Sequence, residues 1–279
     1  MARTIEAAHP VEDQYRHPIV VRVWHWLTAV TALGLLFTGT CVLDVHPRLY
    51  WGEVGNESTP AVVAVESAGP AAPGQPAPTV LTLGERHLNV TGLMGVPLDL
   101  GPEGMYFLIF PLPDSWHFGG MRAWHFALAW VMCLSWLGYC LYLTISGRLR
   151  RVLVPEPDQL KPAAVIHDLW NHLRLRRPRG REAQRYNLLQ KVTYLGVLGA
   201  VVPLLVMTGL TMSNAVTIRF PWLFSLFAGR ESARTLHALA AGLLLLFVII
   251  HIVQLIVVGP VNRLRAMTTG FYRIPKEAR

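Results

Sequence analysis

Four stretches of the chain are long and apolar enough to cross a membrane, and polar sequence separates them. They are residues 18–43, 118–145, 188–212 and 233–258. Each is longer than the roughly 20 residues that a transmembrane helix needs. Only helices and closed barrels satisfy every backbone hydrogen-bonding group in lipid. The pattern therefore predicts an all-α integral membrane protein, a four-helix transmembrane bundle, with residues 1–279 forming a single domain.

The fourth stretch carries two histidines, His237 and His251, with only apolar and small residues between them. They are 14 residues apart. In an α-helix this spacing places both on one face, within about 40° of each other and about 21 Å apart along the axis. Histidine at membrane depth is costly unless it is paired or binds a ligand. One such histidine could serve a proton relay or bond a backbone carbonyl, but two in register indicate a functional site.

Composition and charge agree with a membrane protein. Apolar residues make up 52% of the chain and charged residues 15%, against about 25% charged residues in soluble proteins. The net charge of +8 is unevenly distributed, because residues 147–187 hold ten Lys or Arg while residues 44–117 hold two and eight acids. The positive-inside rule then places both termini and the basic loop 147–187 in the cytoplasm. The charge thus reflects membrane topology, and we expect contact with membrane lipid and no nucleic acid partner.

Two connecting segments have features of their own. Residues 158–177 in the basic loop alternate apolar and charged residues at helical spacing, which predicts an amphipathic cytoplasmic segment along the lipid headgroups. The long periplasmic loop 44–117 exceeds what a simple connection needs, so it is either a binding surface or a variable insertion. Aromatic residues in its flanks could anchor a partner or lie among headgroups: Tyr50, Trp51, Tyr106, Phe107, Phe110 and Trp116.

The predicted topology sorts the histidines of the spans by depth. His25 and His251 lie near the inner surface, and His125 and His237 near the outer surface. Two depth-matched pairs are what two stacked bis-histidine haems require. Zinc is disfavoured, because two histidines leave a tetrahedral ion short of ligands and no buried carboxylate is expected nearby. None of the three cysteines forms a CxxCH motif, so we expect no covalently attached haem.

Several motifs resemble those of a known family, the bacterial di-haem b-type cytochromes of the cytochrome b(561) type. This family includes the membrane subunits of NiFe-hydrogenase, formate dehydrogenase (its gamma subunit) and thiosulfate reductase. The resemblance covers nearly the whole chain. It rests on Arg22-Val-Trp-His25-Trp, Trp124-His125-Phe, the spacing of His237 and His251, Arg185-Tyr-Asn-Leu-Leu-Gln-Lys191, and Leu49-Tyr-Trp-Gly-Glu-Val-Gly-Asn56.

The resemblance implies two non-covalently bound haem b groups and a quinone that binds as an exchangeable substrate. Electrons would pass between the quinone pool and a periplasmic redox partner subunit, and relatives of the thiosulfate reductase type can accompany molybdenum oxidoreductases. It also implies a quinone site at Asn187, Gln190 and His251. Helix capping is the alternative role for Asn187 and Gln190.

Four residues near the histidines are candidates for the haem surroundings. Arg22, Arg122 and Arg234 could pair with haem propionates, although helix ends often carry arginine. Trp24 could pack on a haem or belong to an aromatic belt at the membrane surface.

Two other functions remain open at this point. One is a self-standing membrane cytochrome b that exchanges electrons with a small periplasmic carrier. The other is a haem-free, histidine-lined transporter, which the expected lack of buried carboxylates argues against. As an electron-transfer subunit, the chain need not be an enzyme by itself.

Overall fold

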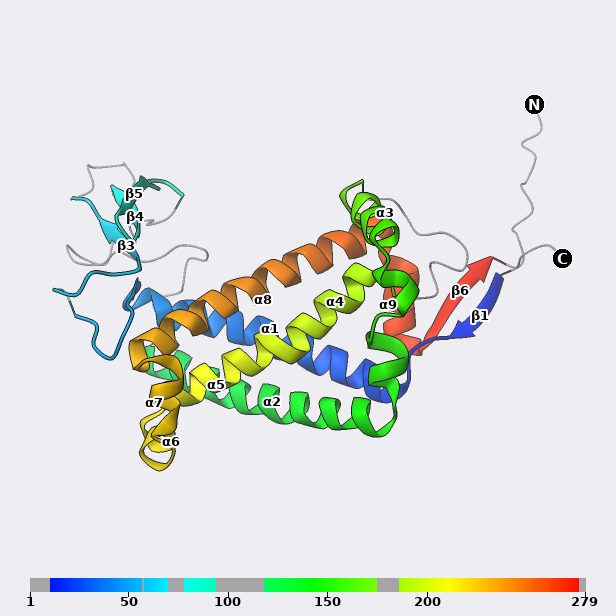
Figure 1. Ribbon diagram of the computed structural model, residues 1–279, viewed down its shortest axis with the longest axis horizontal. Coiled ribbons are helices and arrows are strands. Elements are labelled where there is room, and N and C mark those ends of the chain that lie inside the picture. The colour runs from blue at the N-terminus through cyan, green and yellow to red at the C-terminus, as the bar shows by residue number, and fades with distance from the viewer. Residues whose placement is uncertain (1–10, 57, 70–77, 94–117, 175–185, 276–279) are drawn as a thin grey trace. The chain divides into compact units, whose positions relative to one another are not determined.

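The computed structural model describes residues 11–56, 58–69, 78–93, 118–174 and 186–275 (Figure 1). Its α-helices are α1 (Ile19–Asp44), α2 (Phe118–Ile145), α3 (Pro162–Leu173), α4 (Leu188–Gly196), α5 (Val202–Met212), α6 (Asn214–Arg219), α7 (Trp222–Phe227), α8 (Arg230–Val258) and α9 (Pro260–Thr269). The π-helices η1 (Leu149–Leu153) and η4 (Val197–Val201) and the 3-10 helix η2 (Pro157–Leu160) complete the helical elements. The strands are β1 (Val11–Tyr15), β2 (Arg48–Leu49), β3 (Val63–Ser67), β4 (Thr79–Leu83), β5 (Arg86–Asn89) and β6 (Phe271–Pro275).

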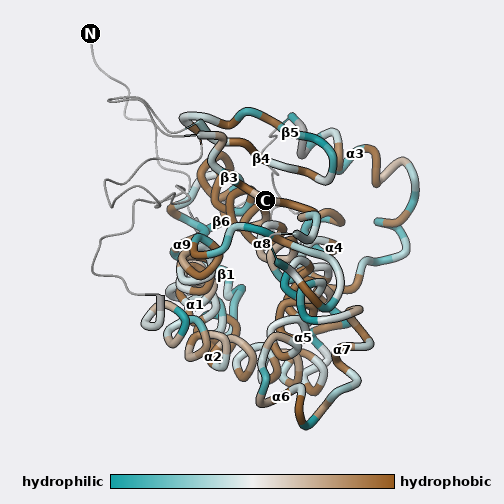
Figure 2. Tube along the Cα trace, turned by 90° about the vertical axis from the view of Figure 1, so that its left-hand side faces the viewer, coloured by the Kyte–Doolittle hydropathy of each residue, from teal (hydrophilic) through white to brown (hydrophobic). Residues whose placement is uncertain are grey.

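Four helical stretches are long and apolar enough to cross a membrane: Ile19–Asp44, Gly119–Ile145, Leu188–Met212 and Arg230–Val258. Their bounds lie within three residues of the predicted spans. Hydrophobic residues follow α1, α2 and α5 in Figure 2, and many large apolar side chains on the spans are exposed. Acyl chains surround such side chains in a bilayer. The chain is therefore an all-α integral membrane protein with four transmembrane helices.

The third span changes helical register near its middle. It consists of α4, the π-helix η4 and α5 in succession. In the π register a carbonyl accepts from the amide five residues further on, and for Leu198 that residue is Pro203, which has no N–H. The indole Nε1 of Trp136 on α2 donates to the Leu198 carbonyl at 2.9 Å instead. A side chain from a neighbouring helix thus satisfies a carbonyl that the lipid could not.

The described residues form two compact units, and α1, α2 and α8 contribute residues to both. The first unit holds α1 up to Val30, α2 from Ser135, α8 from Leu246, and the elements η1, η2, α3, α4 and α9. Its core is built on Val21, Tyr139, Leu143 and Leu153. Strands β1 and β6 pair antiparallel, with Tyr15 opposite Phe271 (Figure 1).

The second unit contains the remaining parts of the spans together with a small sheet. Strands β2, β3, β4 and β5 pair antiparallel in sequence order. The sequence analysis did not predict strands in the 44–117 loop. Their formation gives the described part of this loop a backbone hydrogen-bond network of its own.

The loop and the start of α8 are joined by hydrogen bonds. The carbonyl of Gly52 accepts from the amides of Glu231 and Ser232 at 3.1 and 3.2 Å, and the Gly52 amide donates to Ser232 Oγ at 2.6 Å. The first amides of a helix have no partner inside it, so the loop caps α8. Tyr50 beside this contact is fully buried.

The structure bears on two expectations from the sequence, the amphipathic segment 158–177 and the lack of buried carboxylates in the spans. Helix α3 occupies most of the predicted amphipathic segment and exposes Ile166 and Trp170. The expectation that no carboxylate is buried in the spans is wrong at one end, because α1 extends to Asp44, which is 5% exposed. The rest of the basic loop (175–185) and the aromatic residues Tyr106, Phe107, Phe110 and Trp116 lie outside the described residues.

Candidate functional site

The structure brings the four histidines together as the two expected pairs. The ring centres of His25 and His251 are 6.4 Å apart, and those of His125 and His237 are 6.3 Å apart. A metal–imidazole bond of about 2.0–2.1 Å places the centres of two imidazoles on opposite sides of one metal about 6.4 Å apart. Each pair therefore has the separation that a shared iron would need. Each pair also lies within a single unit.

Neither pair has the ligands for a tetrahedral metal ion. Within the described ranges, no group of three or more His, Cys, Asp or Glu side chains is placed to hold a metal. A structural zinc site needs four such ligands. A porphyrin supplies the four equatorial nitrogens itself, so two axial imidazoles are enough.

Threonine side chains hold both histidines of the His125–His237 pair. Thr38 Oγ1 on α1 lies 3.0 Å from Nδ1 of His125, and Thr208 Oγ1 on α5 lies 3.0 Å from Nδ1 of His237. Each hydroxyl also donates to the carbonyl four residues before it in its own helix, at 2.8 Å to Gly34 and 2.6 Å to Leu204.

These hydrogen bonds fit the tautomer of each ring that has its proton on Nδ1. When the hydrogen of a threonine hydroxyl goes to the backbone carbonyl, the threonine oxygen can accept from Nδ1–H of the histidine. In that tautomer Nε2 carries no proton. An unprotonated Nε2 is the form of imidazole that binds a metal.

A glycine follows each of these threonines and faces the same histidine. A Cβ on Gly39 would lie 3.2 Å from Cε1 of His125, and one on Gly209 would lie 3.5 Å from Cε1 of His237. Thr38-Gly39 and Thr208-Gly209 thus repeat one arrangement on α1 and α5. The sequence alone did not identify these residues as part of a site. The only available signal was a Thr-Gly dipeptide in the first and third spans, and the same dipeptide also occurs at residues 91–92 and 269–270.

The His25–His251 pair has different surroundings. Nδ1 of His25 is buried and has no hydrogen-bond partner in the part of the chain that the structure describes. The ring of Phe247 stacks on His251 with centres 5.8 Å apart, and Trp26 meets His25 edge-on at 5.3 Å. Each histidine of this pair is therefore in contact with an aromatic ring.

Three of the residues predicted to surround a haem already contact other parts of the protein. Arg22 donates to the carbonyl of Thr268 but keeps a buried Nε that no described residue pairs. Arg234 donates to the carbonyl of His46 at 2.5 Å, so it helps to hold the loop. Trp24 stacks on Tyr139 with ring centres 3.7 Å apart and an angle of 5°.

Arg122, the remaining candidate, is exposed on the first turns of α2. Among these four side chains, the buried nitrogen of Arg22 and the buried indole nitrogen of Trp24 are the donors without a partner in the described ranges. Such buried donors fit a site that takes an acceptor group from a ligand.

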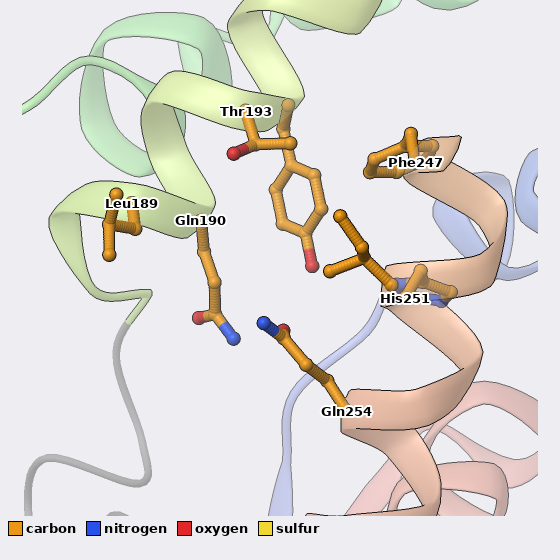
Figure 3. A pocket seen from close by; sticks show the side chains of 8 residues that line it. Leu189, Gln190, Thr193, Phe247, His251 and Gln254 are labelled. Carbon is orange, nitrogen blue, oxygen red and sulfur yellow. The ribbon is translucent and has the colours of Figure 1, made fainter. Parts of the chain in front are cut away.

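A pocket of about 50 Å³ lies beside His251. Its lining comes from α4 and α8: Leu189, Gln190, Thr193, Tyr194, Phe247, Ile250, His251 and Gln254. The side chains of Gln190 and Gln254 point toward one another across it (Figure 3). Tyr194 and Gln254 were not predicted as site residues, since neither has a motif that distinguishes it in the sequence.

Asn187 is not part of the pocket lining. It is the N-cap of α4, where its Oδ1 accepts from the amide of Gln190 at 2.9 Å. In return, Oε1 of Gln190 accepts from the amide of Asn187 at 3.4 Å. This reciprocal arrangement is a capping box, so the structure shows the capping role for Asn187.

Several arginines of the first unit act electrostatically on His17 and Tyr186. Burial, together with the positive charges of Arg16 and Arg148, lowers the pKa of His17 to about 4. Burial raises the pKa of Tyr186, although Arg16, Arg148 and Arg263 act in the opposite direction. His17 and Tyr186 are consequently neutral near pH 7 among several fixed positive charges.

Comparison with known proteins gives a consistent result. Residues 16–270 match the family described as "Prokaryotic cytochrome b561". The putative protein-methionine-sulfoxide reductase subunit YedZ1 of Azospira oryzae is 29% identical over 160 residues, which are 57% of this chain and 77% of that protein. No solved structure matches the chain significantly.

Proposed function

The chain belongs to the prokaryotic cytochrome b561 family, and from this premise we propose that it is a di-haem cytochrome b that relays electrons between a quinone and a periplasmic oxidoreductase. His25 with His251 would hold one haem b, and His125 with His237 a second. Haem iron with two imidazole ligands changes oxidation state by one electron and has no open position for oxygen. A relay fits these sites better than oxygen chemistry does.

The observation that carries the proposal is the separation of the two pairs of rings. Spacings of 6.4 and 6.3 Å suit one iron between each pair. Support comes from Thr38 and Thr208, which leave Nε2 of their histidines free to bind a metal. A haem-free site would have no need for two imidazole pairs at the same separation.

We place the quinone in the pocket beside His251. The amides of Gln190 and Gln254 can donate to a quinone carbonyl or accept from a quinol hydroxyl. The Tyr194 hydroxyl in the same lining can do either as well. Asn187 would contribute indirectly, because its capping box with Gln190 fixes the first turn of α4.

The periplasmic partner is supported by the relative and by the predicted topology. The Azospira oryzae protein is named as a subunit of a protein-methionine-sulfoxide reductase, which supports an oxidoreductase partner for this chain. The charge distribution favours cytoplasmic termini in a bacterial inner membrane, with residues 44–117 on the periplasmic side. The described part of that loop is tied to α8, the helix that carries His237.

Haem content tests the proposal directly. The protein purified in mild detergent should contain two non-covalent haems per chain and show a low-spin reduced spectrum. His125→Ala or His237→Ala should remove one haem, and His25→Ala or His251→Ala the other. Absence of haem in the unaltered protein, or four variants that all keep two haems, would contradict the proposal.

The quinone site is tested in the same preparation. Gln190→Ala and Gln254→Ala should slow reduction of the haems by a quinol while both haems stay bound. Leu226→Ala is a matched control, since Leu226 is exposed on α7 and belongs to the other unit. Unchanged quinol kinetics in the double glutamine variant would place the quinone elsewhere.

A further inference from the structure

The two histidine pairs differ in the hydrogen bonds at Nδ1. Both rings of the His125–His237 pair have a threonine oxygen 3.0 Å from Nδ1. In the other pair, Nδ1 of His25 is buried and lacks a partner throughout the described residues. The pairs have nearly equal ring separations, so this difference concerns their electronic surroundings rather than their spacing.

A hydrogen bond from Nδ1–H changes the ligand strength of an imidazole. The accepting threonine oxygen draws the Nδ1 proton away from the ring, so the ring becomes more basic and donates more strongly through Nε2. A stronger donor favours the oxidised, more positively charged iron. Hydrogen bonds that surrounding residues make to a ligand histidine are a recognised means by which a protein sets the potential of a haem.

On the basis of the proposed function, we propose that Thr38 and Thr208 are positioning residues that set the reduction potential at the His125–His237 pair below that at the His25–His251 pair. The order makes electron transfer from the first of these sites to the second favourable. Because the glutamine-lined pocket adjoins His251, this direction delivers electrons toward the quinone.

Potentiometric titration of the purified holoprotein tests the order. The reduced haem absorbance should follow two one-electron transitions. Thr38→Val and Thr208→Val keep the side-chain shape but remove the hydroxyl, so each should move the lower transition to higher potential and leave the upper one in place. The double variant should move it further, and Thr38→Ser and Thr208→Ser should restore the original value.

The chain offers matched controls on the same helices. Thr40 on α1 and Thr211 on α5 donate to the carbonyls four residues before them, as Thr38 and Thr208 do, but neither is hydrogen-bonded to a ligand histidine. Thr40→Val and Thr211→Val should leave both transitions unchanged. A shift in these controls as large as that in Thr38→Val and Thr208→Val would show a general packing effect and overturn the proposal.

A second measurement needs no threonine variant and decides the question if a valine variant loses haem. His25→Ala should leave the haem at the His125–His237 pair, and His125→Ala should leave the other. The haem that remains in His25→Ala must titrate at the lower potential. The reverse order, or valine variants that shift only the upper transition, would overturn this inference while two bound haems would still support the proposed function.

Discussion

Thr38 and Gly39 act on the same imidazole, that of His125, from adjacent positions on α1. The threonine oxygen lies within hydrogen-bond distance of Nδ1, and the glycine leaves the space that the ring occupies. Thr208 and Gly209 repeat this on α5 for His237. At the scale of single residues, four small residues therefore shape the surroundings of the His125–His237 pair.

Gly39 and Gly209 make a matched pair for mutation. Alanine favours a helix over glycine by about 1 kcal/mol, and a Cβ at Gly209 would make an ordinary contact at 3.5 Å. Gly209→Ala should therefore leave haem content unchanged. At Gly39 the Cβ would lie 3.2 Å from the ring, and such overpacking costs about 1–3 kcal/mol. Gly39→Ala should weaken haem retention at this pair, measured as haem per protein during dilution. Equal retention in both variants would contradict this.

At two places, backbone groups that have no hydrogen-bond partner within their own helix bond to another segment of the chain. The π-helix η4 precedes Pro203 and leaves the Leu198 carbonyl to Trp136. The first amides of α8 are bound by Gly52 in the loop before β3. Gly229 next to this contact has φ +113°, and a Cβ there would lie 2.4 Å from the Gly52 oxygen. Irregular backbone thus occurs where another segment supplies the missing partner.

Trp136→Phe tests the join at η4. The substitution keeps an aromatic ring but removes the indole N–H, so the Leu198 carbonyl becomes unsatisfied inside the membrane. We expect a loss of about 1–3 kcal/mol in stability, seen as a lower melting temperature in detergent. Trp130→Phe is the control, because Trp130 lies on the same helix and is exposed. If both variants melt alike, the hydrogen bond does not stabilise the span.

At the scale of the whole molecule, the four spans supply two imidazole pairs and a pocket beside one of them. Each of α1 and α2 contributes one of these histidines, and α8 contributes both His237 and His251. The third span contributes no histidine but supplies Thr208 through α5 and the pocket residues Gln190 and Tyr194 through α4. Every span thus takes part in at least one of these sites.

Membrane orientation is the prediction that belongs to this scale. Ten basic residues in 147–187 against two in 44–117 favour a cytoplasmic location for the first loop. A reporter fused near Arg179 should be active only in the cytoplasm, and one near Gly74 only outside it. The opposite result would reverse the orientation and place the proposed quinone site on the other side of the membrane.

The sequence by itself determined the four spans and the grouping of the histidines. Apolar length decides which segments cross lipid, and the direction of each crossing decides which histidines share a depth. His25, His125, His237 and His251 could therefore be paired without coordinates. The bounds of the spans could be predicted to within three residues for the same reason.

The tertiary structure decided what surrounds each histidine. Thr38 and Thr208 are ordinary polar residues of apolar helices in the sequence, and only the packing of α1 on α2 and of α5 on α8 brings them to Nδ1. Gln254 joined Gln190 in one pocket, while Asn187 was found to cap α4. Such contacts depend on helix rotation, which an evenly apolar surface does not encode because lipid solvates every face alike.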